Sequence, residues 1–312
     1  MLLNTVASGP QCWLFLAQAR GYLAEAGVAL DLTPGKGAYN AAPGVAADGY
    51  DLGYGDVHAL VDVVARDPGR APIGIFAMFN ASPSAIAVAR DGPVAGPGDL
   101  AGRHLIGHAS DVALRTFPAF CAANGVDAAS VRISPAEGAL AALAERVLGG
   151  DADGLFGYVS TITASYAAAG LRAEDRLRFL RYDRLLPDAY GSMLMASARL
   201  VRDEPALLRR VVAALSRGLA DALADPDAAI AALHAAAPQT DPAVERLRWD
   251  TTLAVEMAHP EAMSRGFGGI DPARFARGIA LHATASGLPR SPGAEEVFTD
   301  VFLPPIPERA VA

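Results

Sequence analysis

The side chains best suited to chemistry stand where a short apolar segment meets a helical pattern. Asp51–Tyr54 is typical of a strand, Asp56 follows it, and the apolar spacing after Val57 is that of a helix. Asp56 is a good N-cap for this helix, and its carboxylate can also accept hydrogen bonds from a ligand. His58, further into the helix, is either a wall residue or a ligand contact. Ligands in open α/β sheets bind where strand ends meet helix N-termini, so the segment is either a ligand site or an ordinary loop.

Other loops in the first part of the chain carry further candidates. Gln11 and Trp13 lie near the start of a predicted helix, where a tryptophan either stacks on a flat ligand or packs in the core. Lys36 is flanked by glycines and is either a partner for a ligand carboxylate or a solvated loop charge. Phe79 and Asn80 end a predicted strand, and the asparagine either pairs with an amide or ring nitrogen or forms a turn.

A second group of candidates belongs to the middle of the chain. Ser110 and Asp111 open a predicted helix, whose free N–H groups favour an anion, although the Asp111 carboxylate partly cancels that preference. Tyr158 and Tyr190 are candidate walls of the same site. No arginine stands in the loops that carry the candidates of the first part of the chain, which disfavours a doubly charged anion as the ligand. The aromatic candidates suit a flat, partly apolar ligand. The residues thus predict a small aromatic or heteroaromatic solute, pyrimidine-like or carrying one carboxylate.

Short strands alternate with helices in two series, and this order positions the candidate residues. The first series predicts a parallel sheet with helices on its faces. A Gly/Pro-rich stretch at 91–98 separates it from the second series, and after 188–197 the pattern is mostly helical. The strands are expected at Leu2–Val6, Val28–Leu32, Asp51–Tyr54, Ala71–Phe79, Ser84–Ala89, His104–Gly107, Val131–Ser134, Asp153–Gly157, Leu177–Tyr182 and Tyr190–Ser197.

The order of elements predicts an α/β fold made of two βα lobes with a central cleft. The first lobe comprises 1–86 and 192–312, and the second lobe, 87–191, is inserted in it. Because interfaces between domains favour ligand sites, the ligand is expected between the lobes.

Composition narrows the partners. The 312 residues carry a formal net charge of −8, which disfavours nucleic acid because phosphate binding needs a basic surface. The two cysteines are far apart, and no spacing of histidine and cysteine suits zinc, so neither a metal nor another cofactor is expected. No apolar run is long enough to span a membrane. No signal peptide is visible, so the chain is expected to be either cytoplasmic or the mature form of a secreted protein.

Several stretches, taken in order, resemble the NMT1/THI5-like group of substrate-binding proteins. The resemblance covers nearly the whole chain, and its specificity comes from the order of the pieces. The stretches are Ala19–Val28, Pro34–Gly37, Tyr50–Asp56, Gly98–Arg103, Leu219–Ala229, Gly266–Pro272 and Glu295–Pro304. One feature departs from many pyrimidine-type members: Phe156-Gly-Tyr158 is followed by Val159-Ser-Thr-Ile162, which contains no carboxylate.

The resemblance implies a type II periplasmic binding protein, the receptor of an ABC importer. Such a receptor is expected to be a periplasmic monomer that captures a small molecule, docks on a permease and catalyses no reaction. Alternatives are a binder of alkanesulfonate- or nitrate-type anions, a ligand-sensing module, and an enzyme similar to the pyrimidine precursor synthases. The enzyme would need a Schiff-base lysine, for which Lys36 is the only lysine available, and a cysteine-rich segment that this chain lacks.

Overall fold

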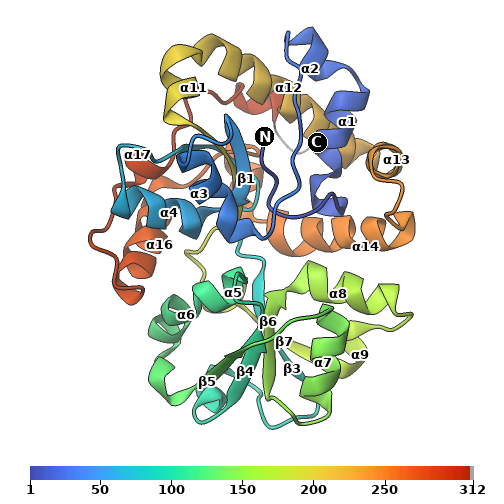
Figure 1. Ribbon diagram of the computed structural model, residues 1–312, viewed down its shortest axis with the longest axis vertical. Coiled ribbons are helices and arrows are strands. Elements are labelled where there is room, and N and C mark those ends of the chain that lie inside the picture. Colours follow the sequence, from blue (N-terminus) through green and yellow to red (C-terminus); the bar gives the residue numbers. More distant parts are fainter. Residues whose placement is uncertain (310–312) are drawn as a thin grey trace.

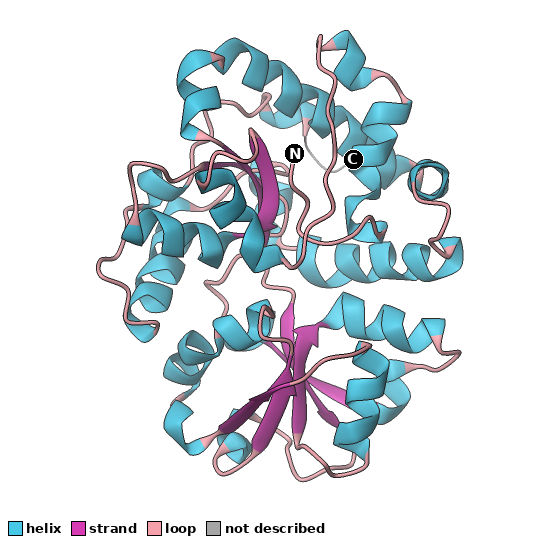
Figure 2. Ribbon diagram, viewed as in Figure 1, coloured by secondary structure: helices cyan, strands magenta, loops and turns pink. Residues whose placement is uncertain are grey.

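Two α/β lobes, stacked one above the other, form the molecule in the computed structural model, which describes residues 1–309 (Figure 1). The strands of each lobe form one sheet with helices around it (Figure 2). The first sheet has the order β1 (Leu52–Asp56), β8 (Ser192–Ala196), β2 (Ile73–Ala77). The second has the order β5 (Arg132–Pro135), β4 (His104–Gly107), β6 (Gly154–Tyr158), β3 (Ser84–Ala89), β7 (Leu177–Arg181). The predicted two-lobed α/β fold is confirmed.

The strands of the first sheet pair antiparallel, and the prediction of a parallel sheet was wrong. β8 lies between β1 and β2 and runs antiparallel to both. The predicted strands Leu2–Val6 and Val28–Leu32 are also absent. Only Leu2 forms isolated bridges, to Gly53 and to Thr33, because the backbone around it pairs for a single residue on each side before the chain turns away.

The chain passes between the lobes twice. β3, which follows the first passage, belongs wholly to the second sheet, where it lies between β6 and β7. β8 follows the second passage and returns to the first sheet. The expected division into 1–86 with 192–312, and 87–191, stays a prediction, but sheet membership assigns all of Ser84–Ala89 to the second lobe.

Helices cover both faces of the first sheet. On one side, α1 packs against α12 and α13 around a core that contains Trp13 and Trp249. On the other side, α4, α16 and α17 enclose a core built on Phe275 and Phe298. The first lobe contains α1 (Cys12–Ala19), α2 (Tyr22–Glu25), α3 (Ala41–Ala46), α4 (Val57–Arg66), α11 (Ala198–Asp203), α12 (Pro205–Ala224), α13 (Pro226–Ala236), α14 (Pro242–Thr252), α15 (Pro260–Arg265), α16 (Pro272–Ala285) and α17 (Ala294–Val297).

The second lobe is smaller, and two helices of the first lobe pack onto it. α14 contacts α8, and α16 contacts α6, so two pairs of helices join the lobes. The helices of this lobe are α5 (Val112–Arg115), α6 (Phe117–Asn124), α7 (Leu140–Leu148), α8 (Val159–Ala168), α9 (Ala173–Arg176) and α10 (Tyr182–Leu185). Within residues 1–309, no helix combines the length and the apolar character that a membrane crossing requires.

The glycines of β1 allow a helix to lie directly on the strand. A Cβ atom on Gly55 would come within 2.4 Å of the Ala41 Cβ, and one on Gly53 within 2.7 Å of Val45 Cγ2. Both neighbours belong to α3, so only glycine fits on this face of the strand. Tyr54 and Asp56 point to the opposite face, because side chains alternate along a strand.

Candidate functional site

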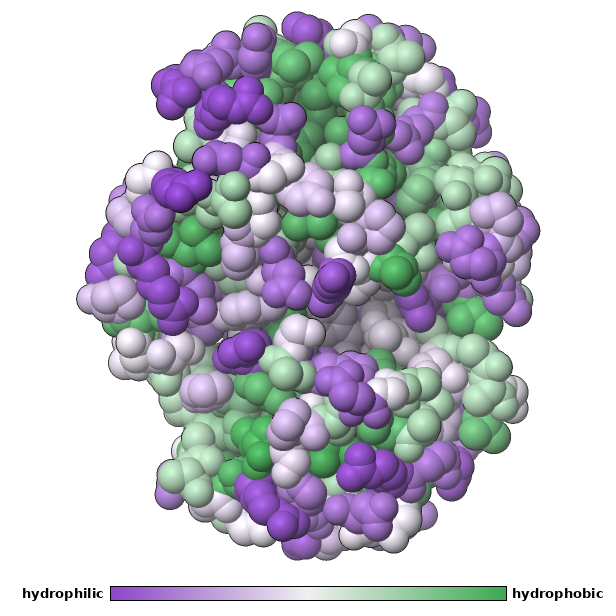
Figure 3. All heavy atoms as spheres, viewed as in Figure 1, coloured by the Kyte–Doolittle hydropathy of each residue, from purple (hydrophilic) through white to green (hydrophobic). Residues whose placement is uncertain are grey.

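A cleft of about 690 Å³ lies between the lobes and is lined by residues of both. Figure 3 shows the hollow in the surface between the upper and the lower lobe. A volume of this size suits a small organic molecule. The lining residues are Thr5, Val6, Ala7, Gly37, Ala38, His108, Ser110, Asp111, Val112, Gly138, Ala139, Leu140, Tyr158, Thr161, Ala164, Ser165, Ala168, Gln239, Thr240, Asp241, Val244, Glu245 and Arg248.

Strand ends of the two sheets meet beside this cleft. Asp56, the last residue of β1, pairs in register with Ser192, the first of β8. In the second sheet, Tyr158, the last residue of β6, pairs with Ser84, the first of β3. Side chains of paired residues share one face of a sheet. Each lobe therefore brings two polar side chains to the end of its sheet, next to the passage between the lobes.

Five buried polar atoms at these strand ends and on Tyr54, in the middle of β1, have no hydrogen-bond partner within residues 1–309. They are Tyr54 Oη, Asp56 Oδ2, Ser84 Oγ, Tyr158 Oη and Ser192 Oγ, and we call their residues the strand-end cluster. Native proteins pair the large majority of their buried polar side-chain atoms, so this concentration needs an explanation. A bound polar molecule would supply the missing partners.

Two further carboxyl groups belong to the same region. Asp111 lines the cleft and accepts a hydrogen bond from the N–H of Ala113, and burial raises the pKa of Asp111 to about 6. Glu256 is 1% exposed and accepts a 2.6 Å hydrogen bond from Ser160 Oγ on α8, across the junction of the lobes. Burial raises the pKa of Glu256 to about 7. Burial raises the pKa of Tyr158, and the nearby negative charges of Asp56, Asp111 and Glu256 raise it further.

Sequence reasoning missed Glu256. It lies in a helical stretch with no strand end or glycine to mark it. In the structure, it belongs to a single π-helical turn, Leu253–Met257, which continues α14. Such turns are rare and frequently occur at functional sites, but their hydrogen-bonding pattern cannot be read from residue types.

Asp56 caps α4, as predicted, and also contacts a buried histidine. Its Oδ1 accepts hydrogen bonds from the backbone N–H of His58 and from His58 Nδ1, both at 2.9 Å. The His58 ring packs edge-on against His282, with ring centroids 4.8 Å apart. His282 Nε2 lies 2.9 Å from Asp62 Oδ1, and burial lowers the pKa of His282. His58 itself does not line the open cleft; it holds Asp56 from behind.

Three predicted contacts are core residues instead. Gln11 is fully buried and bonds to Asn4 and to the backbone of Ser8. Trp13 donates from Nε1 to the carbonyl of Pro10 at 3.1 Å, and its ring packs edge-on against Tyr54. Phe79 packs edge-on against the same tyrosine, at 6.3 Å between centroids. Trp13 and Phe79 support Tyr54, and none of the three side chains has a face left for a ligand, because burial in the core uses their surfaces.

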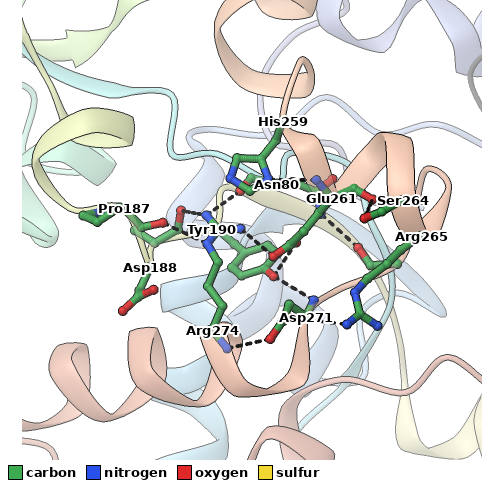
Figure 4. Close-up of polar contacts among 12 residues, drawn as sticks. Asn80, Pro187, Asp188, Tyr190, His259, Glu261, Ser264, Arg265, Asp271 and Arg274 are labelled. Atoms are coloured by element: carbon green, nitrogen blue, oxygen red, sulfur yellow. Dashed lines mark hydrogen bonds and ion pairs between the residues drawn. The ribbon is translucent and has the colours of Figure 1, made fainter.

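Asn80 and Tyr190, predicted as ligand contacts, belong to a buried network at the two passages between the lobes (Figure 4). Asn80 Nδ2 donates to Glu261 Oε2 at 3.0 Å, and Tyr190 Oη donates to the same oxygen at 2.6 Å. Arg274 lies over the Tyr190 ring, 4.2 Å from its centroid, and Nη1 donates to Glu261 Oε1 at 3.2 Å. We call Asn80, Tyr190, Glu261 and Arg274 the hinge network.

The remaining predicted residues divide between the cleft and its rim. Ser110 and Asp111 line the cleft, as does Tyr158. Ser110 Oγ lies 3.2 Å from the position that a Cβ on Gly37 would take, so the loops of the two lobes approach closely here. Lys36 is exposed and is not among the lining residues, which favours the solvated-charge interpretation.

The fold is that of the periplasmic binding proteins. Similar solved structures include the periplasmic aliphatic sulphonate binding protein SsuA from Escherichia coli (15% identity, 96% of this chain and 91% of that one, TM-score 0.66). The ligand binding component of an ABC-type import system from Staphylococcus aureus is also similar (10% identity, 97% of each chain, TM-score 0.65). The desulfurization enzyme DSZB has the same fold (17% identity, 97% and 96%, TM-score 0.60). The fold therefore serves binding proteins and at least one enzyme.

The sequence gives the family. The model of the family described as NMT1/THI5 like matches residues 12–229, and the chain belongs to this family. No curated relative matches the chain with significance. The predicted family membership and the type II periplasmic binding protein architecture are thus both confirmed.

Proposed function

We propose that the protein is the solute-binding receptor of an ABC importer and that it holds a small, flat, partly apolar organic molecule between its lobes. It delivers this solute to a membrane permease, acts as a periplasmic monomer and catalyses no reaction. The strand-end cluster carries the proposal, because both lobes contribute buried polar atoms that lack partners. A ligand that bonds to both lobes would stabilise their closed arrangement.

The comparisons support the receptor role, and the chain's own residues disfavour catalysis. Nucleophilic chemistry on this fold would need an activated side chain. Burial raises the pKa of Cys121 to about 12 and that of Cys12 further, so neither thiol is readily ionised. Lys36 is exposed and stands outside the cleft lining, where it is poorly placed to form a Schiff base with a bound solute.

An anion binder of the alkanesulfonate type is the second candidate. One observation favours it: the guanidinium group of Arg248 lines the cleft, and its Nε atom is buried without a hydrogen-bond partner. Against it, Arg248 Nη1 already lies 3.6 Å from the Glu245 carboxylate, which compensates much of its charge.

Native mass spectrometry of the purified protein tests the proposal. We expect a fraction of the protein to carry one small molecule, which mild denaturation releases for identification. Protein without a retained solute should show a rise in melting temperature with one class of compound in a library of small metabolites, because a ligand that binds only the folded state stabilises it. Failure of both experiments, with folded protein, would contradict the receptor function.

A further inference from the structure

The cleft contains more acidic than basic groups. Its charged lining residues are Asp111, Asp241, Glu245 and Arg248, of which only the last is basic. Arg248 is compensated by Glu245 at 3.6 Å. Behind the lining, Asp56 and Glu256 add two buried carboxyl groups next to Tyr158. An ionic solute that enters this region therefore meets a negative environment.

Asp56 is the carboxylate best prepared for a ligand. It is 1% exposed, and both of its protein hydrogen bonds go to one oxygen, Oδ1. The other oxygen, Oδ2, is buried without a partner. A buried carboxylate oxygen without a donor is costly, by about 1–3 kcal/mol or more. The structure thus places a rigid acceptor beside the cleft and leaves it unsatisfied.

The groups around Asp56 do not supply the missing donor. His58 contacts only Oδ1, and behind it His282 pairs with Asp62, which also accepts hydrogen bonds from Tyr39 Oη and Arg66. On the cleft side, the titratable neighbours of Asp56 are Asp111 and Tyr158, and Tyr158 in turn lies near Glu256 and Tyr54. The two tyrosine hydroxyls can donate or accept, and both are themselves without partners. A donor from outside the protein would satisfy all of these groups.

We propose that the end of the solute buried against Asp56 is a positively charged N–H donor, a protonated amine or an amidinium group. Asp56 is its counter-ion, and the hydroxyl of Tyr158, which lies near both Asp56 and Tyr54, is an additional partner. This inference rests on the proposed function and names the chemical class of its solute. It distinguishes the chain from the sulphonate-binding proteins that share its fold. A sulphonate placed here would face Asp56 and Asp111, and like charges repel.

Four probes test the inference: each has one aromatic ring, and two are cations and two are anions. Benzamidine and benzylamine are cations near neutral pH, and benzoate and benzenesulfonate are anions of similar size. Isothermal titration calorimetry of the protein, dialysed free of small molecules, should give at least about tenfold tighter binding of a cation than of either anion. Charge-assisted hydrogen bonds contribute about 1.5–3 kcal/mol, and each 1.4 kcal/mol is tenfold in affinity.

The variant Asp56→Asn links the preference to the proposed residue. Asparagine has the size of aspartate, and its oxygen can still accept hydrogen bonds from His58. It carries no negative charge, and an NH2 group then takes the place of the unpaired oxygen Oδ2. We expect it to weaken cation binding by about 10–100-fold and to leave the anions unchanged or slightly tighter. Asp225→Asn is the matched control, since Asp225 also caps a helix, α13, but does not line the cleft. It should change neither affinity.

The outcomes separate the inference from the proposed function. Tighter binding of an anion, or cation binding that Asp56→Asn does not weaken, would overturn the cationic class while leaving a solute receptor. If none of the four probes binds, the charge of the solute released in mass spectrometry decides: a cation supports the inference and an anion overturns it. If no solute is found by any route, the proposed function fails, and the inference fails with it.

Discussion

The strand-end cluster and the hinge network are two buried polar clusters that lie close together in the fold, but they differ in how many of their polar atoms have hydrogen-bond partners. In the hinge network, Arg274 donates to the carbonyls of Pro187, Asn80 and Ala189 and to Glu261. The Tyr190 hydroxyl both donates to Glu261 and accepts from the Asp271 N–H. In the strand-end cluster, five polar atoms have no hydrogen-bond partner in the part of the chain that the structure describes.

The difference shows that burial alone does not identify a binding site. Both clusters combine tyrosine with acidic side chains and lie next to the passages between the lobes. A network with its partners present holds the backbone in place, whereas unsatisfied groups need a partner from outside. Asn80 shares features of both clusters: its Nδ2 donates hydrogen bonds within the hinge network, while its Oδ1 is buried and has no partner within residues 1–309. The following predictions test the contrast.

The largest effect is expected from Arg274→Met. Removing the guanidinium leaves Glu261 buried without its positive partner and frees three carbonyl groups, so we expect a loss of about 3–5 kcal/mol in the free energy of unfolding. Urea unfolding measures it. Arg277→Met on the same helix is the control, because Arg277 is 61% exposed in its pair with Asp188 and should cost about 1 kcal/mol or less. Equal losses from the two variants would contradict a structural role for the hinge network.

The second effect concerns pH and Glu256. Its pKa in the folded protein is about 7, above the ordinary value of 4.5, so the folded state binds the proton more tightly than the unfolded state does. Stability therefore falls as pH rises from about 4.5 to about 7, by up to about 3 kcal/mol from this group. Glu256→Gln, which keeps an acceptor for Ser160, should remove this part of the slope. Urea unfolding of the unchanged protein and of Glu256→Gln at pH 5 and pH 8 measures this difference. If the free energy of unfolding changed equally with pH in both proteins, the raised pKa of Glu256 would be contradicted.

Features that depend on residues close together in the sequence could be predicted, whereas features that depend on contacts between distant segments could not. Helix starts are local signals, and Asp56 caps α4 as the sequence predicts. Alternation of strands and helices also gave the two lobes. The direction of β8 was not predictable, because it depends on which strands the returning chain meets. Leu2 pairs for one residue only, and an apolar pattern cannot show where pairing ends.

The site was predictable where it follows from strand ends. Asp111 and Tyr158 line the cleft because Tyr158 ends β6 and Asp111 stands in the loop that follows β4. Trp13, in the first turn of α1, and Phe79, two residues after β2, are equally aromatic, but tertiary packing buries them around Tyr54. Residue type alone cannot distinguish a side chain that lines the cleft from one that packs behind the lining. Glu256 comes from a distant helical turn, and only the packing of α14 on α8 brings it to Ser160.

A tyrosine of the hinge network should respond to loss of its hydroxyl. Tyr190→Phe removes a donor to Glu261 Oε2 and an acceptor for the Asp271 N–H. Both partners remain in or near the buried network, so we expect a loss of about 1–3 kcal/mol in the free energy of unfolding. A change below about 0.5 kcal/mol in urea unfolding would show that the hinge network tolerates the loss of one of the two donors to Glu261 Oε2 and an unpaired Asp271 N–H.

The smallest effect on stability, and the clearest contrast, is expected from Tyr158→Phe in the strand-end cluster. Its hydroxyl is buried without a partner, so removing it should leave the free energy of unfolding unchanged or raise it by about 0.5–1 kcal/mol. Affinity for the solute found by mass spectrometry, or for benzamidine, should fall by about 3–10-fold in the same variant, because a hydrogen bond to the ligand is lost. Calorimetry and urea unfolding on one preparation measure both quantities. A stability loss like that of Tyr190→Phe would mean that the hydroxyl has a partner within the protein, and its orphaned state would no longer mark a ligand site.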